Sequence, residues 1–277
     1  MIYHITTRAE WDSAQSQTFY QPQNYQKDGF IHCSDLFQVE EVANRLYARS
    51  NELLLLSIDP DLADIPVIYE NLEGGEMAYP HLYGALARQA VLAVTAFERD
   101  GGQKWQLPPQ LRLPPPALFT EIPFGLPGKL FRSPLPGSRM FDPQDEVFGH
   151  YLSAGVQTVV VLNPVEEHLR HSGRDVLARY TQAGFEVLHY PTPDFSAPAQ
   201  GFWDEALRQT VSRLREGRNV AVHCHAGVGR TGIFCACLAQ DLLGLPADDA
   251  ITWLRQYIPF AVDTFYQQQF VRAYQRS

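Results

Sequence analysis

The chain has 277 residues, of which 45% are hydrophobic, so it is long enough for two domains with ordinary buried cores. Its formal net charge is −9, and residues 1–104 hold 7 Lys and Arg against 15 Asp and Glu. This acidic excess argues against a broad nucleic-acid-binding surface. No apolar run approaches about 18 residues, and the first residues lack the basic and then apolar pattern of a signal peptide, so we expect neither a membrane span nor a secretion signal.

The first part of the chain is predicted to consist of short strands with few helices. Its apolar residues alternate or form short runs, as in strands, whereas those of residues 39–47 recur at helical spacing. Strands are predicted at residues 2–6, 29–34, 53–59, 67–70, 80–84 and 91–94, and helices at residues 8–15 and 39–47. This mixture predicts a small α+β domain over residues 1–104.

Three segments of this part carry polar side chains on predicted strands: Tyr3-His4-Ile5, residues 28–34 (Asp-Gly-Phe-Ile-His-Cys-Ser) and residues 80–84 (Pro-His-Leu-Tyr-Gly). In these segments the chain resembles a small bacterial domain of unknown function, which is thought to resemble the ADP-ribosyltransferase and RNA 2′-phosphotransferase fold. The resemblance implies a cleft that takes a nucleotide or ADP-ribose. Its candidate residues are His4, His32, Ser34, Glu70, His81 and Tyr83. The alternative is that these side chains are hydrogen-bonded polar groups of the core.

A proline-rich stretch separates the two parts of the chain. Residues 105–117 contain Pro108, Pro109, Pro114, Pro115 and Pro116. Paired and tripled prolines favour an extended, semi-rigid conformation. We therefore predict a linker over residues 105–117.

The last part of the chain alternates between predicted strands and helices. Strands are predicted at residues 156–162, 186–190 and 219–223, and helices at residues 175–184 and 203–214. The alternation predicts an α/β domain over residues 118–277, with a mostly parallel central sheet flanked by helices. Open α/β sheets bind ligands beyond the carboxyl ends of their strands, where the segment after residue 223 would lie.

A glycine-bearing loop follows the strand at residues 219–223. Cys224 comes directly after this strand, and Arg230 precedes a segment with the composition of a buried helix. Such a loop directs backbone N–H groups inward, and the helix dipole adds partial positive charge, so the loop suits an anion. A cysteine at its base is expected to be a thiolate near neutral pH. The alternative, a buried cysteine in a glycine-rich turn, leaves the arginine unexplained.

Cys-x5-Arg suits phosphoryl transfer, because the thiolate attacks phosphorus while the planar guanidinium of Arg230 matches the phosphoryl oxygens. Thr231 can donate a hydrogen bond to the sulfur when it leaves. The full pattern, His-Cys-x5-Arg-Thr-Gly over residues 223–232, resembles the signature of cysteine-dependent protein tyrosine and dual-specificity phosphatases. The phosphate-binding loop of this pattern consists of His225, Ala226, Gly227, Val228, Gly229 and Arg230.

Asp194 is the candidate general acid. It lies in the segment Pro-Thr-Pro-Asp, between a predicted strand and a predicted helix, 30 residues before Cys224. In the phosphatase family an Asp on a mobile loop protonates the leaving oxygen and later takes a proton from water. The two prolines suit a loop that closes as a lid. The alternative is a solvated turn or a helix cap.

Four further residues are assigned from the same resemblance. His223 would support the loop, with simple packing as the alternative, and His225 is a candidate for the pocket rim. Gln267 and Asp263 fall in the region that positions the hydrolytic water, although tyrosine-specific relatives carry Gln where Asp263 stands. A helix start capped by Asp263 or Thr264 is the alternative there.

Together these features predict a two-domain phosphatase that hydrolyses monoesters of the phosphotyrosine, phosphoserine and phosphothreonine class through a phosphocysteine intermediate, with no cofactor and no metal. Its substrate would be a phosphorylated protein or a small phosphate monoester, and its oligomeric state is left open. A phosphate-dependent binding module and a bifunctional enzyme acting on ADP-ribosyl or RNA phosphate groups are the alternatives. Because Cys33, Cys224, Cys235 and Cys237 lack metal-binding spacing and a catalytic thiol needs reducing conditions, we expect a cytoplasmic location.

Overall fold

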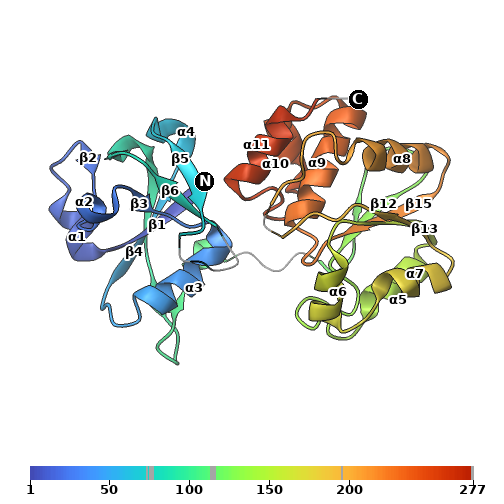
Figure 1. The fold of residues 1–277 in the computed structure, drawn as a ribbon, viewed down its shortest axis with the longest axis horizontal. Coiled ribbons are helices and arrows are strands. Elements are labelled where there is room, and N and C mark those ends of the chain that lie inside the picture. Colours follow the sequence, from blue (N-terminus) through green and yellow to red (C-terminus); the bar gives the residue numbers. More distant parts are fainter. Residues whose placement is uncertain (73, 75–77, 113–116, 195, 276–277) are drawn as a thin grey trace. The chain divides into compact units, whose positions relative to one another are not determined.

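The computed structural model describes residues 1–72, 74, 78–112, 117–194 and 196–275. It divides into two compact units, residues 1–113 and residues 114–277, which we call unit 1 and unit 2 (Figure 1). Each unit has hydrophobic core clusters of its own and is described by itself.

Unit 1 is built from small sheets. The largest has β4 (Leu53–Ile58) in the middle, paired antiparallel with β1 (Ile2–Thr7) and β8 (Val91–Ala96). All residues of β4 are buried, which explains its uninterrupted apolar run. The other strands are β2 (Phe19–Tyr20), β3 (Ile31–His32), β5 (Val67–Glu70), β6 (Tyr79–Leu82), β7 (Leu86–Ala87), β9 (Glu98–Arg99) and β10 (Trp105–Gln106). The helices are α1 (Arg8–Ser13), α2 (Tyr25–Asp28), α3 (Leu36–Leu46) and α4 (Pro60–Ala63), with 3-10 turns η1 (Arg88–Ala90) and η2 (Pro109–Leu111).

A second sheet of unit 1 has the order β3-β6-β5 and carries several of the polar residues singled out above. Its neighbour α3 begins with a capping box, in which the Asp35 side chain accepts from the backbone of Gln38 and the Gln38 side chain accepts from Asp35 N. The buried face of α3 includes Val39 and Ala43, two of the residues at helical spacing. The predicted helix therefore forms, and it begins at Leu36.

Two predicted segments of unit 1 differ in extent. The strand expected at residues 29–34 is reduced to β3 and one isolated bridge between Tyr3 and Ser34, because α2 ends on Gly29 in a left-handed conformation with φ 80°. The linker expected at residues 105–117 is shorter than predicted. Trp105 is buried and its ring N–H donates to Tyr47 O at 2.9 Å, so the chain stays attached to unit 1 through β10 and η2.

Unit 2 contains a five-stranded sheet in the order β11-β12-β15-β13-β14. The central strand β15 (Asn219–His223) is parallel to both neighbours, and β11 pairs antiparallel at one edge. The other strands are β11 (Thr120–Ile122), β12 (Leu130–Ser133), β13 (Val156–Val161) and β14 (Glu186–His189). The helices are α5 (Glu146–Ser153), α6 (Val165–Ser172), α7 (Val176–Gln182), α8 (Asp204–Arg215), α9 (Gly229–Leu243), α10 (Ala247–Leu254) and α11 (Phe265–Ala273). The α/β architecture predicted for this part of the chain is confirmed.

Both faces of this sheet are covered by helices. Figure 1 shows α5, α6 and α7 on one side of the strands and α8 to α11 on the other. Successive residues of β15 belong to different cores: Val220 and Val222 pack with residues of α8 and α9, and Ala221 packs with residues of α5 and α7. This burial on both faces accounts for the continuous apolar run before Cys224.

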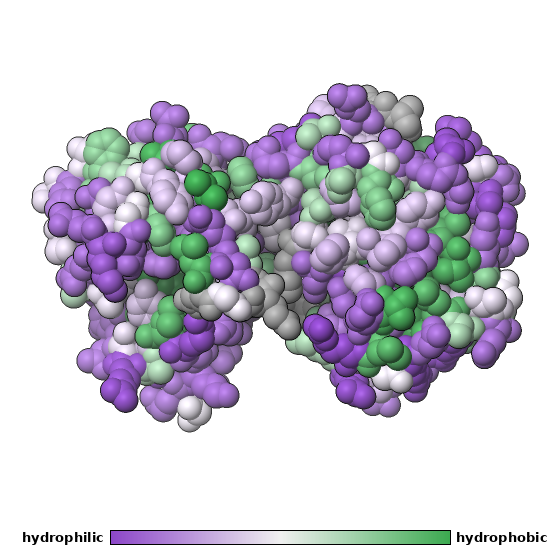
Figure 2. Space-filling view, viewed as in Figure 1, coloured by the Kyte–Doolittle hydropathy of each residue, from purple (hydrophilic) through white to green (hydrophobic). Residues whose placement is uncertain are grey.

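Hydrophilic side chains cover most of the visible face of each unit, and apolar side chains form small groups on it (Figure 2). Of the helices in the described part of the chain, none combines the length and the apolar character needed to cross a membrane.

Candidate active site

The candidate site of unit 2 begins where β15 ends. Cys224 follows the strand and is 3% exposed. The next residues form a tight loop, and His225 O accepts a hydrogen bond from Leu135 N at 2.9 Å. Gly227 has φ +71°, and a Cβ atom built there would lie 2.2 Å from Ser133 O. Only glycine fits this position, because both the backbone conformation and the close approach exclude a side chain.

Several backbone N–H groups of the loop make no hydrogen bond within the described part of the protein. Across the described ranges, no acceptor takes the N–H of His225, Ala226, Gly227 or Val228. These four donors directly follow Cys224 and precede the first turn of α9. Consecutive N–H groups at a helix N-terminus form a concave anion site. The loop can therefore bind a tetrahedral anion above the sulfur.

Arg230 lies in the first turn of α9 and is 1% exposed. Its Nη1 donates to Glu167 Oε1 at 2.9 Å and to Thr192 O at 2.8 Å, and its Nη2 donates to Glu167 Oε2 at 2.8 Å. Asp194 Oδ1 lies 2.9 Å from Nη2. Burial lowers the pKa of Arg230, but the nearby Cys224, Glu167 and Asp194 outweigh it, and the net shift is upward. The guanidinium is thus a fixed cation that joins the loop to the segment of Asp194.

A second buried guanidinium comes from β12. Arg132 is fully buried, and its Nε donates to Gly227 O at 3.0 Å, while its Nη1 donates to Ala117 O. Burial lowers the pKa of Arg132 to about 10, and the Cys224 and Cys235 thiols act in the opposite direction. The group therefore stays charged at neutral pH. Arg132 ties the loop to the sheet and places positive charge near Cys224.

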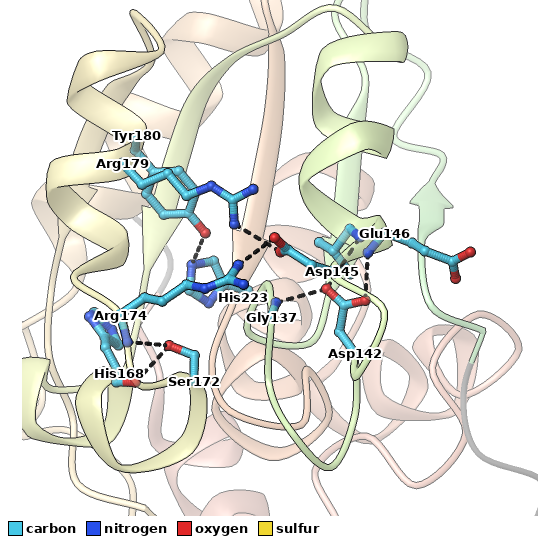
Figure 3. Close-up of polar contacts among 11 residues, drawn as sticks. Gly137, Asp142, Asp145, Glu146, His168, Ser172, Arg174, Arg179, Tyr180 and His223 are labelled. Atoms are coloured by element: carbon cyan, nitrogen blue, oxygen red, sulfur yellow. Dashed lines mark hydrogen bonds and ion pairs between the residues drawn. The ribbon is translucent and has the colours of Figure 1, made fainter.

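His223 is buried directly before Cys224. Its Nδ1 lies 3.1 Å from Cys224 O, and its Nε2 lies 2.9 Å from the Tyr180 hydroxyl (Figure 3). Burial lowers the pKa of His223 to about 3, so the ring is neutral near pH 7. Because a carbonyl oxygen only accepts, Nδ1 carries the proton and Nε2 accepts from Tyr180. The ring therefore fixes the backbone that carries the sulfur.

The segment between β12 and α5 lies beside the loop and is held by carboxylates. Asp142 accepts from Gly137 N and from Glu146 N, both at 2.8 Å (Figure 3). Asp145 pairs with Arg179 at 2.8 Å and with Arg174, which connects the same segment to α7. This segment contains no helix or strand, so these side-chain contacts hold it in position.

His225 contacts this segment at the rim. Its ring stacks on His171 at 3.6 Å between centroids and meets Phe141 edge-on at 5.0 Å. Burial and the neighbouring His171 lower the pKa of His225 to about 4. The ring of His225 is therefore uncharged at neutral pH and lies among aromatic rings.

The other predicted site residues of unit 2 are Thr231, Gln267 and Asp263, and their surroundings differ. Thr231 is fully buried, and its Oγ1 has no hydrogen-bond partner in the part of the chain described. Gln267 packs on the loop, since a Cβ atom at Gly229 would lie 2.7 Å from its Nε2. Thr264, and not Asp263, caps α11, because its side chain accepts from Gln267 N. Burial raises the pKa of Asp263.

In unit 1 the structure brings most of the predicted polar residues to one cavity of about 360 Å³, lined by His4, His32, Ser34, Glu70 and His81. Tyr83 is linked to this group because its hydroxyl donates to Glu70 at 2.7 Å. In the described ranges, no group of three or more His, Cys, Asp or Glu side chains could hold a metal ion in either unit.

Two residues that sequence reasoning missed are Glu167 and Arg132. Glu167 was visible as one of two adjacent acidic residues after a predicted strand, but only the fold brings it to Arg230, 63 positions away. Arg132 follows the apolar pair Leu130-Phe131 outside the predicted strands and helices, and a charge beside two apolar residues is only a weak signal of a buried pairing. Neither signal identifies the partner.

Two family models match the chain. Residues 5–94 match a model described as a protein of unknown function, DUF952, and residues 137–242 match one described as a polymorphic toxin system, DSP-PTPase phosphatase. The first confirms the resemblance of the N-terminal part to a domain of unknown function. By the second, the C-terminal part is similar to phosphatases.

Curated relatives and a solved structure agree for the C-terminal part. Protein tyrosine phosphatase domain-containing protein 1 of Mus musculus is 29% identical over 136 residues, 46% of this chain and 18% of the relative. Dual specificity protein phosphatase CDC14B of Mus musculus is 38% identical over 93 residues, 34% of this chain and 18% of the relative. The chain thus spans less than a fifth of either relative's length. Kinase associated phosphatase with its catalytic-site cysteine replaced by serine is 22% identical, covers 58% of this chain and 94% of that chain, and has a TM-score of 0.51, a likeness in fold.

Proposed function

We propose that unit 2 hydrolyses phosphate monoesters through a phosphocysteine intermediate. The observation that carries this proposal is the run of four backbone N–H groups directly after Cys224 that donate to no acceptor among the described residues, followed by the buried Arg230. We infer that these groups form a cup around a phosphoryl group. Such a cup matches the oxygens of a transferring phosphoryl group, and charge that develops on them is stabilised by donors already in place. The sequence likeness to tyrosine and dual-specificity phosphatases supports the same reaction.

In the first step the Cys224 thiolate attacks phosphorus, the S–P bond forms and the P–O bond to the leaving group breaks. Asp194 gives its proton to the leaving oxygen. What supports this role is the distance of 2.9 Å between Asp194 Oδ1 and Arg230 Nη2. The leaving group departs as a neutral alcohol or phenol.

In the second step a water molecule attacks the phosphocysteine and Asp194 takes its proton. The S–P bond breaks, inorganic phosphate leaves, and the thiolate is restored. We infer that Thr231 turns its hydroxyl to the departing sulfur and that Gln267 orients the water, a role supported by its packing against Gly229. Asp263 is the weaker candidate for this last role, because its segment is held by Arg255 through the carbonyls of Ala261 and Val262.

The substrate class that we propose is phosphotyrosine, phosphoserine or phosphothreonine in a protein, or a small phosphate monoester. His225, His171 and Phe141 form an aromatic group beside the loop, and the pKa of His225 is lowered to about 4, so an aryl or peptide leaving group suits this place better than a second phosphate. A reducing, cytoplasmic setting belongs to the same proposal, because the nucleophile must stay a free thiol.

Turnover of p-nitrophenyl phosphate by the full chain tests the proposal. We expect metal-independent release of nitrophenol, lost by about 10⁴-fold or more in Cys224→Ser, since removing a nucleophile disables the whole catalytic unit. The matched variant Cys33→Ala removes a buried thiol of unit 1 and should keep the activity. If the chain binds phosphate but shows no turnover, unit 2 is a phosphate-dependent binding module and the proposal fails.

For unit 1, an ADP-ribosyltransferase-like fold and binding of a nucleotide or ADP-ribose are proposals that rest on the family resemblance. What supports them is the gathering of His4, His32, Ser34, Glu70 and His81 around one cavity. A bifunctional enzyme acting on ADP-ribosyl or RNA phosphate groups would need both units. A thermal shift of the full chain with ADP-ribose tests the shared premise, and no shift at millimolar ligand contradicts it.

A further inference from the structure

The cavity of unit 1 has the size of a site for one small ligand. Its volume of about 360 Å³ falls at the lower end of the range of about 300–1,000 Å³ that ligand pockets occupy. Its walls come from β1, β3, β5, β6 and α3, which lie together in unit 1 (Figure 1). A ligand of one ring system and a few substituents fits this volume, whereas a dinucleotide would extend beyond it.

Glu70 is the polar group of the cavity that is best prepared to bind a ligand. Its Oε2 accepts from the Tyr83 hydroxyl at 2.7 Å and lies 3.1 Å from His81 Nδ1. These two hydrogen bonds, from Tyr83 first and then His81, lower the pKa of Glu70, so it is ionised near neutral pH. None of the described residues donates to its Oε1. The carboxylate is thus fixed through one oxygen and offers the other as an acceptor.

A second carboxylate lines the same cavity from α1. Glu10 accepts from Thr6 Oγ1 at 3.0 Å through Oε2 and from Gln23 N at 2.5 Å through Oε1. The one Arg or Lys among the described lining residues is Arg45, whose Nε pairs with Glu41 at 2.8 Å. Counting only its Asp, Glu, Lys and Arg side chains, the lining therefore carries two negative charges, on Glu10 and Glu70, and one positive charge, on Arg45. Phosphate groups are disfavoured there, and N–H or O–H donors are favoured.

The other side chains of the cavity supply flat and apolar walls. Tyr47, Tyr79 and Leu46 line it together with the rings of His32 and His81. The His32 and His81 rings lie 5.2 Å apart and almost perpendicular, so they form two sides of a corner. Such walls suit a planar ring.

The buried side chains of His4 and Cys33 line the cavity but are unsuited to acid–base or nucleophilic catalysis. His4 is buried between His32 O, at 2.7 Å from its Nδ1, and the Tyr20 hydroxyl, at 3.1 Å from its Nε2, and burial lowers its pKa. Cys33 is also buried, and burial raises the pKa of its thiol far above neutrality. The cavity therefore reads as a binding site built around Glu70, and not as a thiol-based catalytic site.

We propose that the cavity of unit 1 binds a nucleoside: a planar heterocycle with amino and hydroxyl donors and without a phosphate group. Glu70 Oε1 accepts from a donor of this ligand, and the histidine and tyrosine rings hold its base. This proposal departs from the nucleotide or ADP-ribose that the family resemblance implies, since the charge of the cavity opposes phosphates. The proposal is independent of the activity of unit 2.

Isothermal titration of the full chain with adenosine, guanosine, cytidine and uridine, and with each 5′-monophosphate, tests the proposal. We expect at least one nucleoside to bind with a dissociation constant below about 1 mM. Its monophosphate should bind at least about tenfold more weakly, which is a loss of about 1.4 kcal/mol in binding free energy. If no nucleoside binds, or if a monophosphate binds more tightly than its nucleoside, the proposal is overturned.

Substitutions in the cavity and on the surface show whether the nucleoside binds in the cavity. Glu70→Gln keeps the shape but removes the charge and should weaken nucleoside binding at least about tenfold, since a neutral amide oxygen accepts a weaker hydrogen bond than a carboxylate oxygen. The same substitution at Glu52, which is exposed and paired with Arg8, is the matched control and should change nothing. Should Glu70→Gln fail to fold, Val42→Phe fills the cavity from α3 without touching the polar network and should abolish binding. Unchanged binding in a folded cavity variant would place the ligand elsewhere.

Discussion

The two units gather polar side chains in opposite ways. In unit 2 the candidate groups lie around one backbone loop after one strand, and its two buried cations are at that loop: Arg230 lies in the first turn of α9, and Arg132 Nε donates to Gly227 O. In unit 1 the groups come from several short strands and helices, and carboxylates are in excess. A contiguous loop can be recognised in a sequence because its parts are adjacent, whereas a site assembled from scattered short elements cannot. Because the charges differ, we propose ligands of different kinds for the two sites.

The largest effect that would sharpen this comparison concerns the acid of unit 2. Asp194→Asn should lower kcat by about a hundredfold to ten-thousandfold, the usual range for a general acid, with little change in KM. The limb of the pH profile on which the rate falls as the acid loses its proton should flatten. Steady-state rates with a series of aryl phosphates check this: the loss should be smallest for p-nitrophenyl phosphate, whose leaving group needs no proton. Equal losses across the series would remove Asp194 from its role.

The next effect tests whether the cation of unit 2 needs its carboxylate partner. Glu167→Gln removes the charge that pairs with both nitrogens of Arg230. Because a hydrogen bond between charged groups is worth about 1.5–3 kcal/mol, the affinity for vanadate or phosphate should fall by roughly tenfold to a hundredfold. The neighbouring Glu166→Gln, which changes an exposed side chain of the same helix, should bind the anion as the wild type does. The same loss in both variants would contradict a specific role for Glu167.

A smaller effect concerns the second guanidinium. Arg132→Met removes the donor to Gly227 O and a positive charge near Cys224. The rate at which iodoacetamide alkylates Cys224 at neutral pH should drop severalfold, because the thiolate loses electrostatic support. Lys129→Met changes an exposed cation of the same strand's edge, paired with Glu121, and serves as the control. Alkylation rates measured by mass spectrometry distinguish the two variants, and an unchanged rate in Arg132→Met would show that its charge does not reach the sulfur.

The smallest effect is on stability and concerns the neutral histidines of unit 2. Burial lowers the pKa of His223 to about 3, and His168 and His225 are lowered to about 4, all below the ordinary value of 6.5. Because the unfolded state binds protons near pH 6.5 and the folded state only near pH 3–4, the free energy of unfolding is highest above pH 6.5. It falls as the pH drops from 6.5 toward about 3–4. His223 alone should reduce the free energy of unfolding by about 1–2 kcal/mol between pH 6.5 and pH 5.

Urea unfolding of the full chain at several pH values measures this slope. His223→Gln should flatten it, although the variant also loses the bond to Tyr180 and is less stable at neutral pH. His150→Gln, at an exposed position of α5, should keep the slope of the wild type. A slope that is the same in His223→Gln and the wild type would exclude proton uptake by His223 as its cause.

The alternation of elements predicted most of unit 2 and the position of its loop. β15, Cys224 and Arg230 follow one another in the chain, so their arrangement depends on one strand, one turn and one helix start. The same reasoning predicted the bounds of the elements in unit 1 less well. The start of the strand expected at residues 29–34 is taken by α2 and its Gly29 cap, and Trp105 draws the start of the expected linker onto unit 1. Tertiary contacts decide such short elements, because two or three strand residues have little preference of their own.

By itself the sequence determined the α/β class of unit 2, the order strand, loop and helix around Cys224, and a polar group in unit 1 drawn from distant segments. Only the tertiary structure decided that Glu167 and Thr192 hold Arg230, that Arg132 lies beneath Gly227, and that Glu70 offers one oxygen to a cavity. The reason is physical. Local order follows from neighbours in the chain, whereas the partner of a buried charge is chosen by the packing of elements that are far apart in sequence.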